Sequence, residues 1–96
     1  MLESKFQSDL IKELRKRFPD CIVIKNDPNY IQGIPDLLIL HGSHWAALEC
    51  KKSKSASHRP NQDYYVSRMN AMSYANFICP ETREEVLYEL EKAFES

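Results

Sequence analysis

Two apolar segments flank a short glycine-containing turn in the middle of the chain. The first covers residues 34–40 and the second residues 45–51, and Gly42, one of only two glycines, lies between them. Apolar runs of this length joined by a short turn are typical of a β-hairpin. If Leu40 pairs with Trp45 at the closed end, the register of the two antiparallel strands is fixed along their whole length.

The predicted register brings three charged side chains to one face of the hairpin. Counting back from the closed end places Asp36 directly opposite Glu49, where two like charges destabilise a sheet unless something positive lies between them. Lys51 follows Glu49 by two residues, so it points to the same face. Taken separately, Asp36 suits a turn after Pro35, and Glu49 with Lys51 suits an exposed ion pair. Taken together, the three residues favour a divalent-metal site beside a phosphate.

The rest of the sequence predicts helices alternating with short strands. Together with the hairpin they give the order α-β-β-β-α-β-α, which indicates an α/β fold with a sheet flanked by helices and a C-terminal helix. The remaining predicted helices cover residues 4–18, 58–73 and 82–94, and the remaining strands cover 21–25 and 76–79. No repeat or linker interrupts this pattern, so we expect a single domain over residues 1–96.

Composition excludes several classes of protein. At 96 residues with 43% hydrophobic and 28% charged residues, the chain is typical of a small globular domain. No apolar stretch approaches the roughly 20 residues that cross a bilayer, so we expect a cytoplasmic protein without a membrane partner. Three cysteines occur singly, which favours buried thiols over disulfides. Two glycines cannot form a glycine-rich phosphate loop, so no nucleotide cofactor is expected.

Charge is unevenly distributed along the chain. A formal net charge of −1 argues against a protein that coats nucleic acid through its overall potential. Nevertheless Lys51, Lys52, Lys54 and Arg59 follow one another with no acid before Asp63. This basic segment adjoins the predicted site and could bind a polyanion, or it could be a solvated loop.

Two further polar residues are candidates for the same site. Glu3 continues the apolar stripe of the first helix, which includes Phe6 and Leu10, so it faces the site or stabilises the positive end of the helix. Gln62 shares one face of the second helix with Tyr65, Met69 and Met72 at helical spacing, and we expect this face to pack on the sheet, with Gln62 just after the basic segment. It could hold a water molecule or a phosphate oxygen, or it could bind a neighbouring loop.

A zinc site is a weaker interpretation of the same region. His41 and His44 could act as ligands with Cys50 or His58. The two histidines lie at the closed end of the hairpin, far from the acids, and the thiol faces away from Glu49. We therefore favour the carboxylate site.

The motifs resemble those of the PD-(D/E)xK nuclease superfamily, in particular its small VRR-Nuc branch. The matching strings are GIPDL at 33–37, LECK at 48–51 and RPNQ at 59–62, preceded by Glu3 in the first helix. The resemblance covers nearly the whole chain and implies a restriction-endonuclease-like αβββαβ core with a mixed sheet. Stand-alone proteins of this size in the branch are commonly phage-encoded, which would place this one in a bacterial cytoplasm.

The resemblance also implies an activity, that of a DNA endonuclease dependent on Mg²⁺ or Mn²⁺. Asp36 and Glu49 would bind the metal with the backbone carbonyl of Cys50, and Glu3 would bind the metal or a second metal through water. Lys51 would position the attacking water, and Gln62 would orient the lysine or the phosphate. Cys50 would contribute only its backbone. The predicted catalytic set therefore consists of five side chains: Asp36, Glu49, Lys51, Gln62 and Glu3.

The implied substrate is branched DNA of the Holliday-junction type. Lys52, Lys54 and Arg59 would bind its phosphates, and a homodimer would place two sites on two strands. A nicking or single-strand nuclease without junction preference is the alternative within the same chemistry. A DNA-binding module without activity is the alternative outside it.

Overall fold

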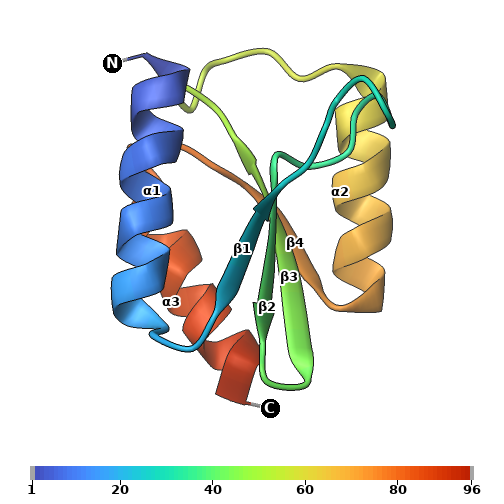
Figure 1. The fold of residues 1–96 in the computed structure, drawn as a ribbon. Coiled ribbons are helices and arrows are strands. Elements are labelled where there is room, and N and C mark those ends of the chain that lie inside the picture. Colours follow the sequence, from blue (N-terminus) through green and yellow to red (C-terminus); the bar gives the residue numbers. More distant parts are fainter. Residues whose placement is uncertain (1, 96) are drawn as a thin grey trace.

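A four-stranded mixed sheet forms the centre of the computed structural model, which describes residues 2–95 (Figure 1). The elements are α1 (Glu3–Arg17), β1 (Ile22–Lys25), β2 (Leu37–His41), β3 (His44–Cys50), α2 (Pro60–Met72), β4 (Tyr74–Ile78) and α3 (Arg83–Glu95). The strands are ordered β1-β2-β3-β4. The first three are antiparallel, whereas β4 is parallel to β3 because α2 crosses over between them. The predicted α/β class and element order are confirmed.

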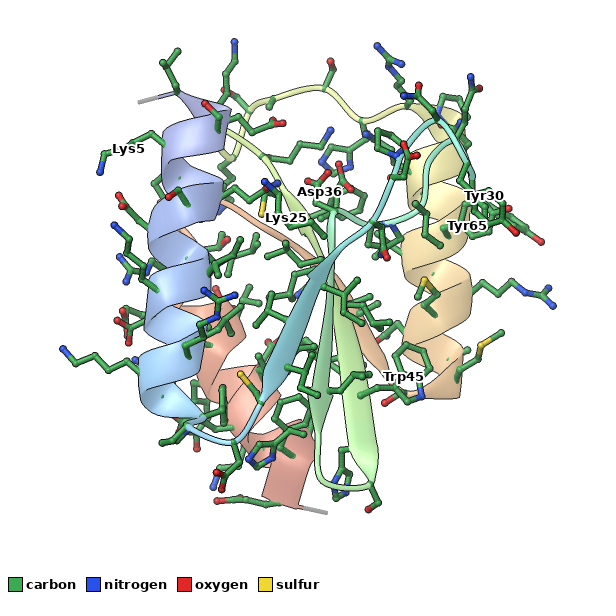
Figure 2. All side chains as sticks on the ribbon, viewed as in Figure 1. Lys5, Lys25, Tyr30, Asp36, Trp45 and Tyr65 are labelled. Atoms are coloured by element: carbon green, nitrogen blue, oxygen red, sulfur yellow. The ribbon has the colours of Figure 1, made fainter. Side chains whose placement is uncertain are left out.

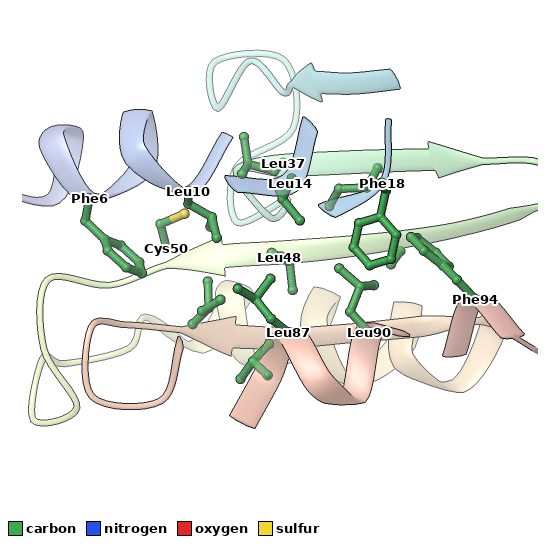
Figure 3. Packing of buried hydrophobic residues seen from close by; sticks show 14 residues of the cluster. Phe6, Leu10, Leu14, Phe18, Leu37, Leu48, Cys50, Leu87, Leu90 and Phe94 are labelled. Atoms are coloured by element: carbon green, nitrogen blue, oxygen red, sulfur yellow. The ribbon is translucent and has the colours of Figure 1, made fainter. Parts of the chain in front are cut away.

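Helices cover both faces of the sheet. Helices α1 and α3 lie on one face and α2 on the other (Figure 1). The larger core lies beneath α1 and α3, where Leu10 and Leu14 meet Leu87 and Leu90 over Leu48 of β3 (Figure 3). All five are fully buried, and burying each leucine contributes about 1.5–3 kcal/mol. This core fixes the sheet on which the functional residues lie.

Small side chains bring α2 close to the other face of the sheet. Val66 of α2 packs on Ala47 of β3 and Ala75 of β4, and Met69 borders this smaller cluster. The sequence favoured an inward face that included Met72, and this prediction is wrong because Met72 is 62% exposed. The helix is rotated so that Val66 takes the innermost position. No helix within residues 2–95 is long and apolar enough to cross a membrane.

One end of the sheet collects the polar segments. Strand β2 begins there and β3 ends there, close to the first turns of α1 and α2 (Figure 1). The segment 51–59 crosses this end on its way from β3 to α2. Asp36 lies at the same end, whereas Trp45 lies at the opposite end (Figure 2). The fold therefore gathers the predicted site residues at a single rim.

Candidate metal and phosphate site

Asp36 and Glu49 lie opposite each other at this rim. The observed register pairs Leu37 with Leu48, so the predicted pairing of the two strands is confirmed. One position beyond that pair, the two segments are joined by hydrogen bonds from backbone N–H groups to side-chain carboxylates. The Asp36 N–H donates to Glu49 Oε1 at 3.1 Å, and the Cys50 N–H donates to Asp36 Oδ2 at 2.9 Å. Each carboxylate is thus oriented by the backbone of the opposite strand.

Gln62 joins the two strands to the first turn of α2. Its Nε2 donates to Glu49 Oε2 at 3.0 Å, and its Oε1 accepts from Lys51 Nζ at 2.7 Å. The same Oε1 accepts from the Arg59 N–H at 3.1 Å, which satisfies one of the free donors at the start of the helix. Lys51 Nζ also donates to the Ser57 carbonyl at 3.1 Å. These bonds fix the ammonium group beside the carboxylates.

The charges of this network are buried. Glu49 and Lys51, with 4% and 8% of their surfaces exposed, are the buried charged residues of the described chain. Burial and, to a smaller extent, the negative charge of Asp36 together raise the pKa of Glu49 to about 7, against the opposing effect of the Lys51 charge. Burial likewise raises the pKa of Asp36, while the Cys50 N–H and the charge of Lys51 work against that rise. Two adjacent carboxylates with raised pKa values require protons or a cation.

The donor set fits a hard divalent cation. Asp36 and Glu49 provide carboxylate oxygens. Within residues 2–95 there is no group of three or more histidine, cysteine or acidic side chains that could hold a metal ion, so these two carboxylates have no third side-chain ligand of this kind. A cation here would complete its coordination with backbone oxygen and water. Mg²⁺ is commonly bound in this way, through one or two carboxylates and several waters, whereas structural zinc takes four protein ligands.

Two hollows meet at Gln62 and Arg59. We call the first the carboxylate hollow, with a volume of about 210 Å³, because Asp36 and Glu49 line it together with residues of the 28–34 loop. We call the second the basic hollow, with a volume of about 640 Å³. The basic hollow is lined by Glu3, Lys51, Lys52, Arg59, Gln62, Ser53 and residues 55–57. A polyanion lying across both hollows would contact the carboxylates and the cations together.

Glu3, Cys50 and Lys54 occupy different positions around the site. Glu3 is the first residue of α1, is exposed, and borders the basic hollow, where its charge contributes to the raised pKa of Glu49. The Cys50 side chain packs in the core beneath α1 and α3, so only its backbone is at the site. Lys54 is exposed and lines a neighbouring pocket with Phe77.

Two residues outside the predicted catalytic set, Asn26 and Gly33, help to hold the segment that carries Asp36. The Asn26 N–H donates to the Asp36 carbonyl and its Nδ2 donates to the Pro35 carbonyl, both at 2.8 Å. Gly33 has a φ of +89° and lies so close to Asn61 that a Cβ on it would come within 2.7 Å of the Asn61 backbone. Only the glycine carried a signal in the sequence, because it precedes the Ile-Pro-Asp string.

The histidines of the disfavoured zinc site lie elsewhere. His41 pairs with His44 at the closed end of the hairpin. The His41 ring stacks on Phe94 at 5.2 Å and meets Phe18 edge-on at 5.5 Å. These contacts make His41 part of the packing between the hairpin and the helices.

Comparison with known proteins identifies the fold. No family model and no curated protein matches the sequence. Among solved structures, the chain is similar to that of Archaeoglobus fulgidus Hjc, a Holliday junction resolvase from an archaeal hyperthermophile. The two share 19% sequence identity and a TM-score of 0.56, over 79% of this chain and 67% of the resolvase. The protein therefore has the fold of that resolvase.

Proposed function

We propose that the protein is a metal-dependent DNA endonuclease that hydrolyses phosphodiester bonds. The observation that carries the proposal is the buried network in which Gln62 joins Glu49 to Lys51 beside Asp36. Burying a carboxylate and an ammonium group costs free energy unless each is paired and hydrogen-bonded. A small domain that keeps both at its rim is organised for chemistry rather than for stability alone.

Asp36 and Glu49 would hold Mg²⁺ or Mn²⁺, with help from the Cys50 backbone carbonyl and from Glu3 through water. When bound, such an ion supplies Lewis-acid stabilisation of phosphate charge and makes a water molecule more acidic. The other proposed roles fall to side chains of the protein. Lys51 positions the attacking water and offsets the charge that develops on the phosphate. Gln62 keeps that ammonium group in place through the 2.7 Å hydrogen bond.

Cations beside the network would bind the DNA backbone. Lys52 and Arg59 line the basic hollow, and Lys54 lies on the same 51–59 segment. Side chains of this kind contact phosphates and carry little base information. The acidic α3 lies on the other side of the sheet from α2 (Figure 1), so the net charge of −1 does not describe the face that would meet DNA.

We propose branched DNA of the Holliday-junction type as the substrate. The support is the likeness to a protein described as a Holliday junction resolvase. A homodimer would supply the two sites needed to cut two strands. Ile22 and Ile24, 59% and 40% exposed on the edge strand β1, give a second copy an apolar surface. Sedimentation as a monomer at micromolar concentration, both free and on DNA, would remove the dimer.

Two alternatives keep parts of this proposal. A nicking or single-strand nuclease would use the same residues without a preference for junctions. A DNA-binding module without activity would need only the basic hollow, and the complete set of Asp36, Glu49 and Lys51 argues against it. The VRR-Nuc assignment and a phage origin stay predictions.

A cleavage assay tests the function directly. Labelled four-way junction, flap, single-stranded and linear duplex DNA are incubated with Mg²⁺, Mn²⁺ or EDTA, beside the Glu49→Ala variant. We expect cutting that needs the divalent ion and disappears in the variant, and the order of the substrates separates a resolvase from a nickase. Binding without cutting of any substrate would favour the module without activity.

A further inference from the structure

An apolar groove adjoins the carboxylate hollow. Its volume is about 430 Å³, and its apolar walls come from Tyr30, Ile31, Ile34, Leu38 and Met69. Ile34 lines both this groove and the carboxylate hollow. The two spaces therefore share a wall. The carboxylate hollow is lined mainly by polar side chains, whereas the groove is lined mainly by aliphatic and aromatic ones, with Asn26 and Asp27 as its polar members.

The 26–34 loop that forms this wall is held in place at both ends. Asn26 is bonded to the backbone of Pro35 and Asp36, and Gly33 packs against the first turn of α2. Within the loop, the Tyr30 N–H donates to the Asp27 carbonyl at 3.1 Å. Because the loop is fixed to Pro35 and Asp36, which lead into β2, the groove keeps a constant position relative to the carboxylates.

Tyr30 is the most exposed of the large apolar residues in the described chain, with 85% of its surface accessible. It lies on the same side of α2 as Tyr65 (Figure 2), and Met69 follows Tyr65 by one helical turn. An exposed ring on a fixed loop loses little conformational freedom when a flat ligand stacks on it. Aromatic platforms beside a cationic track are the usual means of holding bases of single-stranded nucleic acid.

We propose that this groove binds an unpaired nucleobase next to the phosphate in the carboxylate hollow, with Tyr30 as its stacking partner. Because the two spaces share the wall at Ile34, a nucleotide whose phosphate lies beside Asp36 and Arg59 has an apolar space within reach of its base. A base inside a duplex has both faces covered and cannot use the groove. The inference rests on the proposed nuclease function and adds a preference for DNA with an unpaired nucleotide at the cut.

The test compares binding of two DNA molecules of the same sequence, one fully paired and one with a single extrahelical nucleotide. Anisotropy is measured in EDTA, so that binding is read without cleavage, and 2-aminopurine at the extrahelical position reports stacking. Tyr30→Ala removes the ring, Tyr30→Phe keeps it, and Tyr88→Ala removes another exposed tyrosine on α3, which lies on the other side of the sheet.

We expect Tyr30→Ala to weaken binding of the DNA with the unpaired nucleotide by roughly five- to hundredfold, as loss of one base–aromatic stack does. Binding of the paired DNA should change by less than about twofold. Tyr30→Phe and Tyr88→Ala should match the wild type on both molecules, and 2-aminopurine should be quenched only where the ring is present.

Equal affinity of wild type and Tyr30→Ala for the unpaired substrate would overturn the proposal. An equal loss of affinity for both DNA molecules in Tyr30→Ala would also overturn it. A changed sedimentation coefficient of this variant with unchanged DNA binding would overturn it as well, because Tyr30 would then be a contact between proteins. A wild-type protein that cuts no DNA would refute the nuclease function. The binding comparison would still decide whether the groove takes a base.

Discussion

The side-chain amide of Gln62 donates to Glu49 Oε2 at 3.0 Å across 13 residues of sequence. Its oxygen accepts from Lys51 Nζ at 2.7 Å. One neutral residue thus orients a buried carboxylate and a buried ammonium group at once, and its own position is set by the start of α2. The catalytic geometry that we propose therefore depends on how α2 is seated as well as on the hairpin.

Replacing Gln62 by alanine should slow cleavage more than it weakens DNA binding. Glu49 loses the donor on its Oε2, and Lys51 Nζ keeps its hydrogen bond to the Ser57 carbonyl but loses the one to Gln62. The carboxylate and the ammonium group are then held less firmly. We expect a loss of roughly ten- to hundredfold in cleavage rate, as for other residues that orient a metal ligand. Single-turnover kinetics with saturating protein measure the rate, and anisotropy measures binding. Ser67→Ala, at an exposed position of the same helix, is the control.

An unchanged single-turnover rate in Gln62→Ala would show that the strands alone hold Lys51 and Glu49. A rate that falls in proportion to binding would instead assign Gln62 to contact with DNA. Gln62→Glu separates the two roles further, because it keeps an acceptor for Lys51 but places a third carboxylate in the network.

The metal-free protein should lose stability as the pH rises through about 7. Burial, together with the negative charge of Asp36, raises the pKa of Glu49 from 4.5 to about 7 in the folded state. Above pH 4.5 the unfolded chain therefore releases this proton more readily than the folded one. The contribution of Glu49 is fully present below pH 4.5 and is lost above the folded pKa, a change on the order of 3 kcal/mol at most. Urea denaturation in EDTA between pH 4.5 and 8.5 measures it.

The Glu49→Gln variant is the matched comparison for this pH series. It keeps the shape of the side chain and cannot ionise, so the decline attributed to Glu49 should be absent from its stability profile. Mg²⁺ added at pH 8 should stabilise the wild type and not the variant. Parallel profiles for the two proteins would rule out a raised pKa at Glu49.

The hairpin and its register were predictable because local rules determine them. Alternating side chains and a short turn fix which residues face each other, so the Asp36–Glu49 pairing could be counted from Leu40 and Trp45. The order of helices and strands followed from periodicity in the same way. Buried leucines at helical spacing, such as Leu10 and Leu14, required an apolar sheet beneath them.

Other contacts between distant segments could not be predicted from the sequence. The bonds of Asn26 to Pro35 and Asp36 depend on how β1 leaves the sheet, and an asparagine in a polar loop gives no sign of them. The rotation of α2 that exposes Met72 depends on the close approach of Val66 to alanines in two strands. Such features arise only when the elements pack together.

Replacing Asp36 should abolish cleavage while DNA binding is retained or tightened. The substitution to alanine removes a proposed metal ligand and also removes a negative charge near the phosphate. It leaves the Cys50 N–H without the acceptor seen at 2.9 Å, so Asp36→Asn, which keeps an acceptor oxygen, is the companion variant. Gel-based cleavage and anisotropy are measured on the same junction DNA. Cleavage by either variant at the wild-type rate would refute the metal assignment.

Lys54 should contribute to DNA affinity without contributing to sequence preference. It is exposed on the segment that crosses the rim, and its proposed contact is a phosphate. Lys54→Ala should therefore weaken binding by a similar factor on DNA of any sequence. The slope of log affinity against log salt concentration should fall by about 0.9 if one duplex phosphate contact is lost. Lys12→Ala, exposed on α1, is the matched control, and an equal effect of the two substitutions would argue against a specific phosphate contact by Lys54.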